Sequence, residues 1–172
     1  MRRLQTGEDK GLNELMDRWR DPLVNYLIRY VGHREDAIDI AQEAFVRVYR
    51  NRQHFQAERT FSTWLYSIAT NLARNHLRWR GRHPDRAGRF ELKLELADSR
   101  LTPSQELVAT ERADQVRHAV TNLPANLREV VLLFYYQHLT HAEIAATLKT
   151  TPKAVEIRLR RSRSRLEALL KI

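Results

Sequence analysis

Apolar residues recur at helical spacing in three segments of the first half of the chain, residues 13–31, 35–51 and 61–80. Apolar positions at i, i+3, i+4 and i+7 lie on one face of a helix, which can then pack against a core. The second segment follows this rule closely, with Ala37, Ile40, Ala41, Ala44, Phe45 and Val48. The pattern predicts three amphipathic helices, the first bent or restarted at Pro22, because proline is best tolerated in a first turn.

The periodicity stops after the third segment and resumes near residue 103. Two glycines and a proline stand among charged residues over 81–89, which marks a break between elements. Helical spacing then returns over 103–122, 125–137, 141–148 and 152–172. The sequence therefore predicts an all-α fold of two small helical domains, residues 1–81 and 103–172, joined by a linker over residues 82–102.

The last two predicted helices have the pattern of a helix-turn-helix. Thr140 and Glu143 have the spacing of a capping box at the start of the first helix. The expected shared core consists of Ile144, Leu148, Val155 and Leu159. Lys149 stands at the turn position that glycine often occupies, where a left-handed conformation costs about 1 kcal/mol.

The outer face of the last helix is polar and rich in arginine. Its outward positions are Lys153, Glu156, Ile157, Arg160, Arg161 and Ser164, flanked by Arg158, Arg163 and Arg165. A helix in the major groove reads bases near its N-terminal half and holds phosphates with adjacent arginines. The alternative is an amphipathic surface helix that binds nothing, or that binds a membrane.

The predicted helix over 61–80 has a second polar face, opposite its apolar stripe. That face contains Thr63, Ser67, Thr70, Asn71, Arg74, Asn75 and Arg78, and Phe61 and Trp64 flank its start. Amides can read base edges, arginines can hold phosphates and aromatic rings can stack on unpaired bases, so this face suits a melted DNA strand. The alternative is a solvated polar face beside core aromatics.

The predicted helix over 35–51 has an acidic surface near its start, formed by Asp36, Asp39, Gln42 and Glu43. Acidic residues repel DNA, so a protein partner is the better expectation for this surface. The alternative is compensation of the helix dipole, since acids early and bases late stabilise any helix by about 0.3–1 kcal/mol each.

Charge and composition narrow the function further. The chain has 30 Lys and Arg against 21 Asp and Glu, a formal net charge of +9, which favours a polyanionic partner. It has no cysteine, which excludes disulfides and thiolate metal sites. No signal peptide or membrane-spanning segment is evident, so a cytoplasmic location is expected.

No catalytic motif is present. The chain has no Gly-rich phosphate loop and no nucleophile motif, so no enzyme activity is expected. His138 and His141 with Glu143 could suggest a metal, but they straddle a predicted helix start, where capping and core roles are the better interpretation.

Together, these segments resemble the extracytoplasmic-function (ECF) sigma factors of bacterial RNA polymerase. Residues 36–45 are similar to the family's region 2.2, residues 60–78 to regions 2.3 and 2.4, and residues 123–166 to region 4. The resemblance covers almost the whole chain in the family's order and spacing. The sequence departs from the family pattern at Lys149 and at Ala41 and Ala44, where bulkier residues are common.

The resemblance implies a cofactor-free, non-enzymatic factor that binds core RNA polymerase and recognises promoter DNA to start transcription. The β′ coiled coil would be contacted by Asp36, Asp39, Gln42 and Glu43, and a further polymerase contact would be the β flap. The −10 element would be bound by Phe61, Thr63, Trp64, Ser67, Asn71, Arg74, Asn75 and Arg78. The −35 element would be bound by Thr140, Lys153, Glu156, Ile157, Arg158, Arg160, Arg161 and Arg163.

Within these sets, the resemblance assigns Asn71 to a flipped −10 base, helped by the connector over 54–60. Lys153, Glu156, Ile157 and Arg160 would face −35 bases, while Arg158, Arg161 and Arg163 would favour phosphates. An anti-sigma factor that holds the protein inactive is common in the family.

Two other classes of protein compete with this interpretation. One is a dimeric helix-turn-helix repressor or activator with a sensor domain in its first half, which leaves the acidic helix and the face of Trp64 and Asn71 unexplained. The other is an interaction-only or membrane-surface protein, which vesicle binding without DNA binding would reveal.

Overall fold

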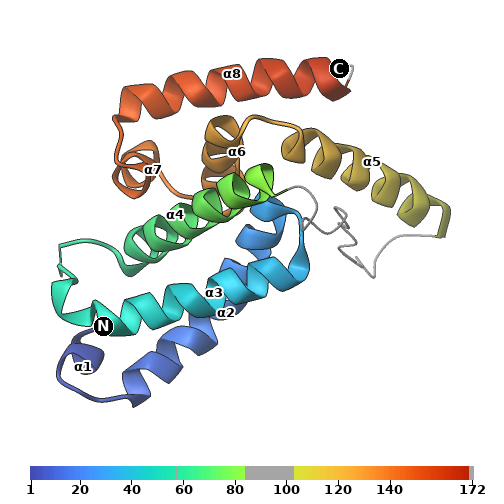
Figure 1. Cartoon of the computed structure of the whole chain (residues 1–172). Helices are drawn as coiled ribbons and strands as arrows, with labels where there is room; N and C mark the ends of the chain where they lie inside the picture. The colour runs from blue at the N-terminus through green and yellow to red at the C-terminus, as the bar shows by residue number, and fades with distance from the viewer. Residues whose placement is uncertain (57, 84–102, 171–172) are drawn as a thin grey trace.

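The first domain is a bundle of three helices in the computed structural model, which describes residues 1–56, 58–83 and 103–170. Helices α2 (Lys10–Val31), α3 (Arg34–Arg50) and α4 (Phe61–Arg82) pack on one another. The short helix α1 (Arg2–Gln5) and the 3₁₀ turn η1 (Arg52–His54) close one end of this bundle (Figure 1). Residues 84–102, most of the predicted linker, lie outside the described residues.

The second domain contains α5 (Pro103–Thr121), α6 (Ala125–Val131), the π-helical turn η3 (Leu132–Tyr136), α7 (His141–Leu148) and α8 (Pro152–Leu170). Helix α8 packs on α5, α6 and α7. The helix predicted over 125–137 is thus divided, because the chain widens into a π turn. The all-α prediction and the helix-turn-helix of α7 and α8 are confirmed, and the described part of the chain contains no strand.

Helix α2 is continuous through Pro22, so the predicted possibility of a restart at this residue is wrong. Pro22 is exposed, which lets water bond the carbonyl that the missing N–H leaves free. The helix ends where Gly32 adopts a left-handed conformation, with φ of 81°, and its N–H bonds the carbonyl of Ile28.

The alanines of α3 lie in the core. Ala41 and Ala44 are buried where α3 packs against its neighbours, and small side chains let helix backbones approach closely. The departure from the bulkier family pattern therefore has a packing role in this chain.

The two domains pack directly against each other. Helix α7 lies against α4, while η3 and α5 contact α2. Buried residues of both domains form one continuous cluster, which includes Tyr26, Tyr30 and Tyr66 at the boundary. Helices α3 and α8 lie on opposite sides of α4 (Figure 1). This arrangement determines which of the predicted binding surfaces are open.

Candidate nucleic-acid and protein-binding surfaces

The helix-turn-helix is held by local bonds at both ends of α7. The Thr140 hydroxyl accepts a bond from the Glu143 N–H, and the Glu143 carboxylate accepts one from the Thr140 N–H at 2.9 Å, so the predicted capping box is confirmed. Lys149 adopts the left-handed conformation, with φ of 52° and ψ of 54°, as expected. Ile144, Leu148, Val155 and Leu159 are all buried between the helices, also as expected.

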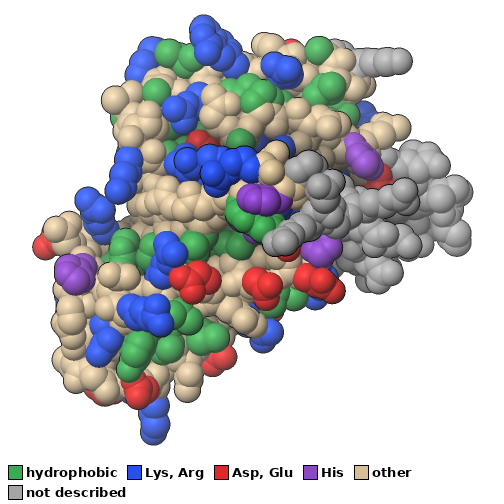
Figure 2. Space-filling model, viewed as in Figure 1, with side chains coloured by type: hydrophobic (Ala, Val, Ile, Leu, Met, Phe, Trp, Pro, Cys, Tyr) green, Lys and Arg blue, Asp and Glu red, His purple; other side chains and the backbone are tan. Residues whose placement is uncertain are grey.

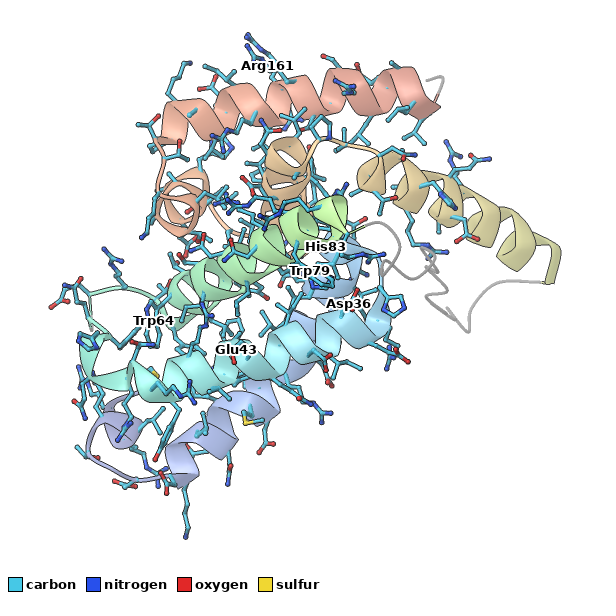
Figure 3. The ribbon with its side chains drawn as sticks, in the orientation of Figure 1. Asp36, Glu43, Trp64, Trp79, His83 and Arg161 are labelled. Carbon is cyan, nitrogen blue, oxygen red and sulfur yellow. The ribbon has the colours of Figure 1, made fainter. Side chains whose placement is uncertain are left out.

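The outer face of α8 is exposed and positively charged. Arg160, Arg161 and Arg163 are exposed, and Arg163 donates to the Tyr135 hydroxyl at 2.9 Å. Lys153 bonds Glu156 at 2.9 Å, and this contact lowers the pKa of the Glu156 carboxyl. Figure 3 shows Arg161 projecting away from the rest of the molecule. Most of the residues predicted to bind the −35 element therefore lie on one open surface.

Three members of that predicted set are less available to DNA. Ile157 is half-buried, and so is Arg158, whose guanidinium lies 3.5 Å from the Glu129 carboxylate. The hydroxyl of Thr140 is occupied by the capping box.

The polar face of α4 is only partly open. Asn71, Asn75 and Arg78 are exposed, whereas Thr63 and Thr70 are buried, contrary to the polar surface predicted for them. Thr63 lies beneath α7, with its carbonyl 3.5 Å from the Thr147 hydroxyl, and Thr70 bonds the Tyr26 hydroxyl at 2.7 Å. Packing of α7 and α2 against this face is the physical reason for the difference.

The start of α4 carries a cluster of aromatic rings. Phe61 and Trp64 are half-buried, and Trp64 lies 5.1 Å from Phe55, measured between ring centroids. Phe61 lies 5.9 Å from Trp19 in an edge-to-face arrangement. Ser67 is also half-buried. The rings serve the core on one side and keep part of their surface exposed on the other.

The acidic surface of α3 is smaller than predicted. Asp39 and Gln42 are exposed, and Glu43 is half-buried and paired with Arg47 at 2.7 Å. The Asp36 carboxylate is instead bonded to α4, at 3.1 Å from both His76 and Arg80. Figure 2 shows acidic side chains gathered over α3 and Lys and Arg side chains gathered between α4 and α8.

The N-terminal helix α1 has a role that was not predicted from the sequence. Gln5 of α1 donates from its amide to the carbonyls of Arg52 and Phe55, both at 3.0 Å, and so holds the start of the connector before α4. Leu4 is fully buried. One leucine among charged residues has no periodicity, so no pattern signalled this helix.

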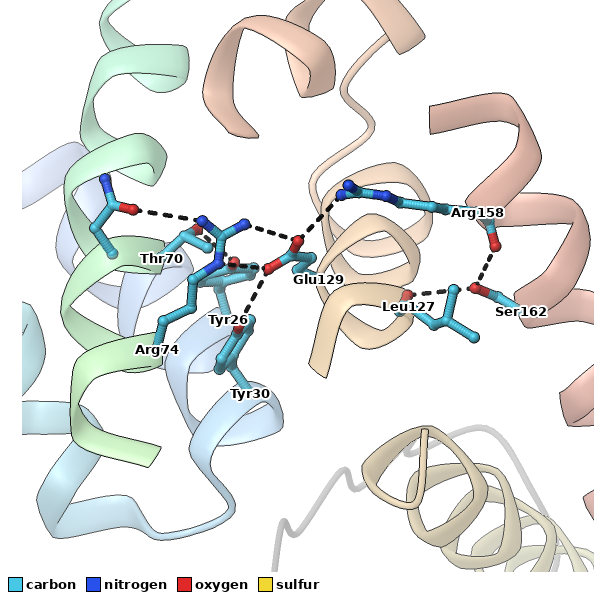
Figure 4. Close-up of polar contacts among 9 residues, drawn as sticks. Tyr26, Tyr30, Thr70, Arg74, Leu127, Glu129, Arg158 and Ser162 are labelled. Atoms are coloured by element: carbon cyan, nitrogen blue, oxygen red, sulfur yellow. Dashed lines mark hydrogen bonds and ion pairs between the residues drawn. The ribbon is translucent and has the colours of Figure 1, made fainter. Parts of the chain in front are cut away.

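The sequence reasoning also missed Glu129, the centre of a polar cluster between the domains. Glu129 is 1% exposed and accepts hydrogen bonds from Tyr30 and, through both carboxylate oxygens, from Arg74 (Figure 4). Burial and the nearby Glu129 charge raise the pKa of the Tyr30 phenol, and the hydrogen bond to Glu129 raises that of the Arg74 guanidinium. The available signal was a glutamate inside an apolar run, since a buried charge needs a partner.

Two kinds of feature are absent from the described residues. No helix among them is long and apolar enough to cross a membrane. No group of three or more His, Cys, Asp or Glu side chains in the same residues could hold a metal ion.

Comparison with known families assigns both halves of the chain. Residues 15–83 match the model of sigma-70 region 2, and residues 113–166 match that of sigma-70 region 4. The chain is 33% identical to the ECF RNA polymerase sigma-E factor of Haemophilus influenzae, over 96% of this chain and 90% of that protein. It is 30% identical to the ECF sigma factor SigW of Bacillus subtilis, over 99% of this chain and 95% of that protein.

Solved structures share the same fold. The sigma factor RpoE of Bartonella quintana, determined with the anti-sigma factor NepR, has a TM-score of 0.77 at 20% identity and covers 95% of this chain and 98% of its own. CnrH, determined with the cytosolic domain of CnrY, has a TM-score of 0.72 at 23% identity and covers 98% of this chain and 92% of its own. From the two region matches and the full-length relatives, this chain belongs to the ECF sigma factors of bacterial RNA polymerase.

Proposed function

We propose that this sigma factor divides promoter recognition between its two domains. Residues 1–81 bind core polymerase and hold the −10 element, and residues 103–172 read the −35 element, with residues 82–102 linking them. The chain binds core RNA polymerase and directs it to promoters to start transcription, and it is not an enzyme. The observation that supports the division is the different charge of two exposed surfaces, with the acids Glu35 and Asp39 exposed on the first half of α3 and arginines exposed along the outer face of α8.

The −35 element is assigned to α8. Lys153, Glu156 and Arg160 are exposed along its N-terminal half, where a major-groove helix reads base edges. Arg161 and Arg163 are exposed beside them and suit phosphates. Arg158 supports this surface from beneath, because its guanidinium points at Glu129.

The −10 element is assigned to α4 and the aromatic cluster at its start. Asn71 and Asn75 present exposed amides one helical turn apart, and Arg78 lies one turn further along. Trp64 and Phe61 offer partly exposed rings for an unpaired base. Capture of an extruded base offsets the unstacking cost of a few kcal/mol.

Core polymerase is assigned to the exposed face of α3. Asp39, Gln42 and Glu43 form its polar part, and Val46, which is 41% exposed, adds an apolar contact one turn away. An apolar side chain beside acids suits a basic helical partner better than DNA.

Two modest DNA sites on one polymerase-bound chain reinforce each other through effective concentration. The free chain should therefore bind DNA weakly and with poor specificity. We place it in the cytoplasm with the polymerase, and we propose an anti-sigma factor as a further partner. The RpoE relative was determined as a complex with one.

The test is transcription by purified core polymerase on a promoter library, with and without this chain at moderate salt. New start sites that share two motifs at a fixed spacing are expected. Asp39→Arg should abolish them by loss of core binding, and Asn71→Ala should reduce them with core binding intact.

Asp17→Arg is the matched control, since it reverses an exposed acid on α2, outside the proposed surfaces. It should leave transcription unchanged. Core polymerase that gains no start sites, together with a chain that fails to bind core, would overturn the proposal.

A further inference from the structure

One buried carboxylate bonds two side chains across the domain boundary. Glu129 of α6 faces two side chains of the first domain, Arg74 of α4 and Tyr30 of α2 (Figure 4). Arg74 donates from Nε at 2.9 Å and from Nη2 at 2.7 Å, and the Tyr30 hydroxyl donates at 3.2 Å. A two-pronged guanidinium–carboxylate pair of this kind sets the geometry of the boundary as well as contributing energy.

The pair occupies Arg74, which the family resemblance assigns to the −10 element. The Arg74 side chain is 30% exposed and directs two of its donors at Glu129. A third donor lies 3.5 Å from the Asn71 amide oxygen. While this contact persists, Arg74 is not available to a DNA phosphate.

Neighbouring contacts cover the start of the same helix. Thr63 is 6% exposed and Thr147 of α7 is 2% exposed where the two helices cross. The Tyr66 hydroxyl of α4 donates to the side-chain oxygen of Gln137. A further bond joins the domains away from α4, where Arg128 of α6 donates to the carbonyl of Tyr30 in α2 at 2.6 Å. A DNA strand can reach Thr63 and Tyr66 on this part of α4 only after the domains separate.

Separation of the two domains would break some contacts of Glu129 and leave another in place. Arg74 and Tyr30 belong to the first domain and would be lost, whereas Arg158 belongs to the same domain as Glu129 and would remain. The carboxylate therefore keeps one cationic neighbour in both arrangements. This makes separation reversible, because no buried charge is left without a partner.

We propose that Glu129 is an interdomain latch, meaning that its carboxylate holds the free chain closed through Arg74 and Tyr30. In the closed form, Arg74 and Thr63 are withheld from the −10 strand, and binding of core polymerase opens the chain. This inference rests on the proposed function of α4. Desolvation of both partners offsets much of the attraction in a buried ion pair, so the latch can hold without being irreversible.

The test measures the distance between the domains in the full chain. The sequence has no cysteine, so Asp17→Cys on α2 and Glu167→Cys on α8, both exposed, give two unique positions for fluorescent or spin labels. Glu129→Gln removes the charge at nearly constant shape, and the distance distribution should shift to longer values. Core polymerase added to the labelled chain with Glu129 intact should give the same shift to longer distances.

DNA binding supplies the second measurement. The probe is a random-sequence single-stranded 20-nucleotide DNA, followed by fluorescence anisotropy at one fixed salt concentration. Glu129→Gln should raise the affinity of the free chain by roughly tenfold, the scale expected from loss of a charge-assisted hydrogen bond that favours the closed form.

Two variants control for damage to the fold. Tyr30→Phe removes only the second bond to Glu129, and a smaller shift in the same direction is expected. Asp114→Asn makes the same carboxylate-to-amide change in a pair within α5, next to Arg117, and should shift nothing. Circular dichroism melting identifies any unfolded variant. If Glu129→Gln is unfolded, the distance distribution of Tyr30→Phe tests the latch instead.

An unchanged distance distribution in folded Glu129→Gln and Tyr30→Phe would overturn the latch. Failure of the wild-type chain to support transcription would overturn the proposed function instead, without altering the distance result. The distance measurement thus tests the latch, and the transcription assay tests the proposed function, independently of each other.

Discussion

At the scale of single residues, the domain boundary contains buried and half-buried polar side chains that make several hydrogen bonds each, although the buried Nε of Arg128 has no partner among the described residues. Arg128 illustrates this: its guanidinium donates to the carbonyls of Tyr30, at 2.6 Å, and Leu123, at 3.1 Å, and to that of Thr121. Burial lowers the pKa of this guanidinium, though arginine stays charged at any ordinary pH. Such a group stabilises a fold mainly because its removal would leave several buried acceptors without a donor.

Replacement of Arg128 by alanine should therefore destabilise the chain by about 2–4 kcal/mol, measured as the free energy of unfolding in urea. Arg59→Ala, at an exposed position, should change it by less than about 0.5 kcal/mol. Equal effects of the two substitutions would mean that the carbonyl contacts contribute nothing.

The buried tyrosines make a prediction about pH. Burial raises the pKa values of Tyr26, Tyr30 and Tyr66 above the ordinary value. Above about pH 10 the unfolded chain loses these protons while the folded chain keeps them, so stability should fall as pH rises. Urea unfolding at pH values from 8 to above 10 measures this, and Tyr66→Phe should flatten the dependence.

At the scale of elements, the ends of α7 set the geometry of the helix-turn-helix. The capping box fixes its start, and Lys149 closes its end in the left-handed conformation. A side chain is strained there by about 1 kcal/mol, which glycine avoids. The strain is tolerated because this turn places α8, which begins at Pro152, in contact with α7.

Lys149→Gly should consequently stabilise the chain by about 0.5–1 kcal/mol. Ala146→Gly, in the last turn of the same helix, should destabilise it by up to about 1 kcal/mol. Thermal melting monitored by circular dichroism measures both, and a destabilised Lys149→Gly would show that the lysine side chain makes a contribution larger than the strain.

At the scale of the whole molecule, the three proposed binding surfaces, on α3, α4 and α8, differ in how far they are exposed in the closed arrangement. The exposed faces of α3 and α8 lie on opposite sides of α4 and stay open (Figure 1). The polar face of α4 is covered in part, by α7 over Thr63 and by Glu129 at Arg74, while Asn71, Asn75 and Arg78 stay exposed. The free chain should therefore meet duplex DNA with α8 while Thr63 and Arg74 of its −10 surface stay covered.

Affinity of the free chain for random-sequence duplex DNA should fall steeply with salt, because phosphate contacts release counterions. Arg160→Ala and Arg161→Ala should each lower the slope of log affinity against log salt by about 1. Arg50→Ala, at an exposed position on the opposite side of α4, should leave the slope unchanged. Anisotropy titrations at several salt concentrations measure this, and equal slopes throughout would remove α8 from the DNA surface.

Periodicity predicted most of the local structure. The spacing of Ala37, Ile40 and Ala44 predicted α3 to within one residue at each end, and the capping box predicted the start of α7. The prediction was less accurate where tertiary contacts override local preference, as at Pro22 and at the π turn of η3. For the candidate site, the exposed arginines of α8 were predicted, whereas the burial of Thr63 and the bonds of Asp36 were not.

By itself, the sequence determined the family, the order of the helices and the chemistry of each helix face, because these follow from spacing along the chain. Only the tertiary structure decided which faces are open. Thr63 and Arg74 lie on a polar face by periodicity, yet α7 covers one and Glu129 binds the other. Periodicity reports what a helix can present to a partner, whereas packing of distant segments decides which partner it meets.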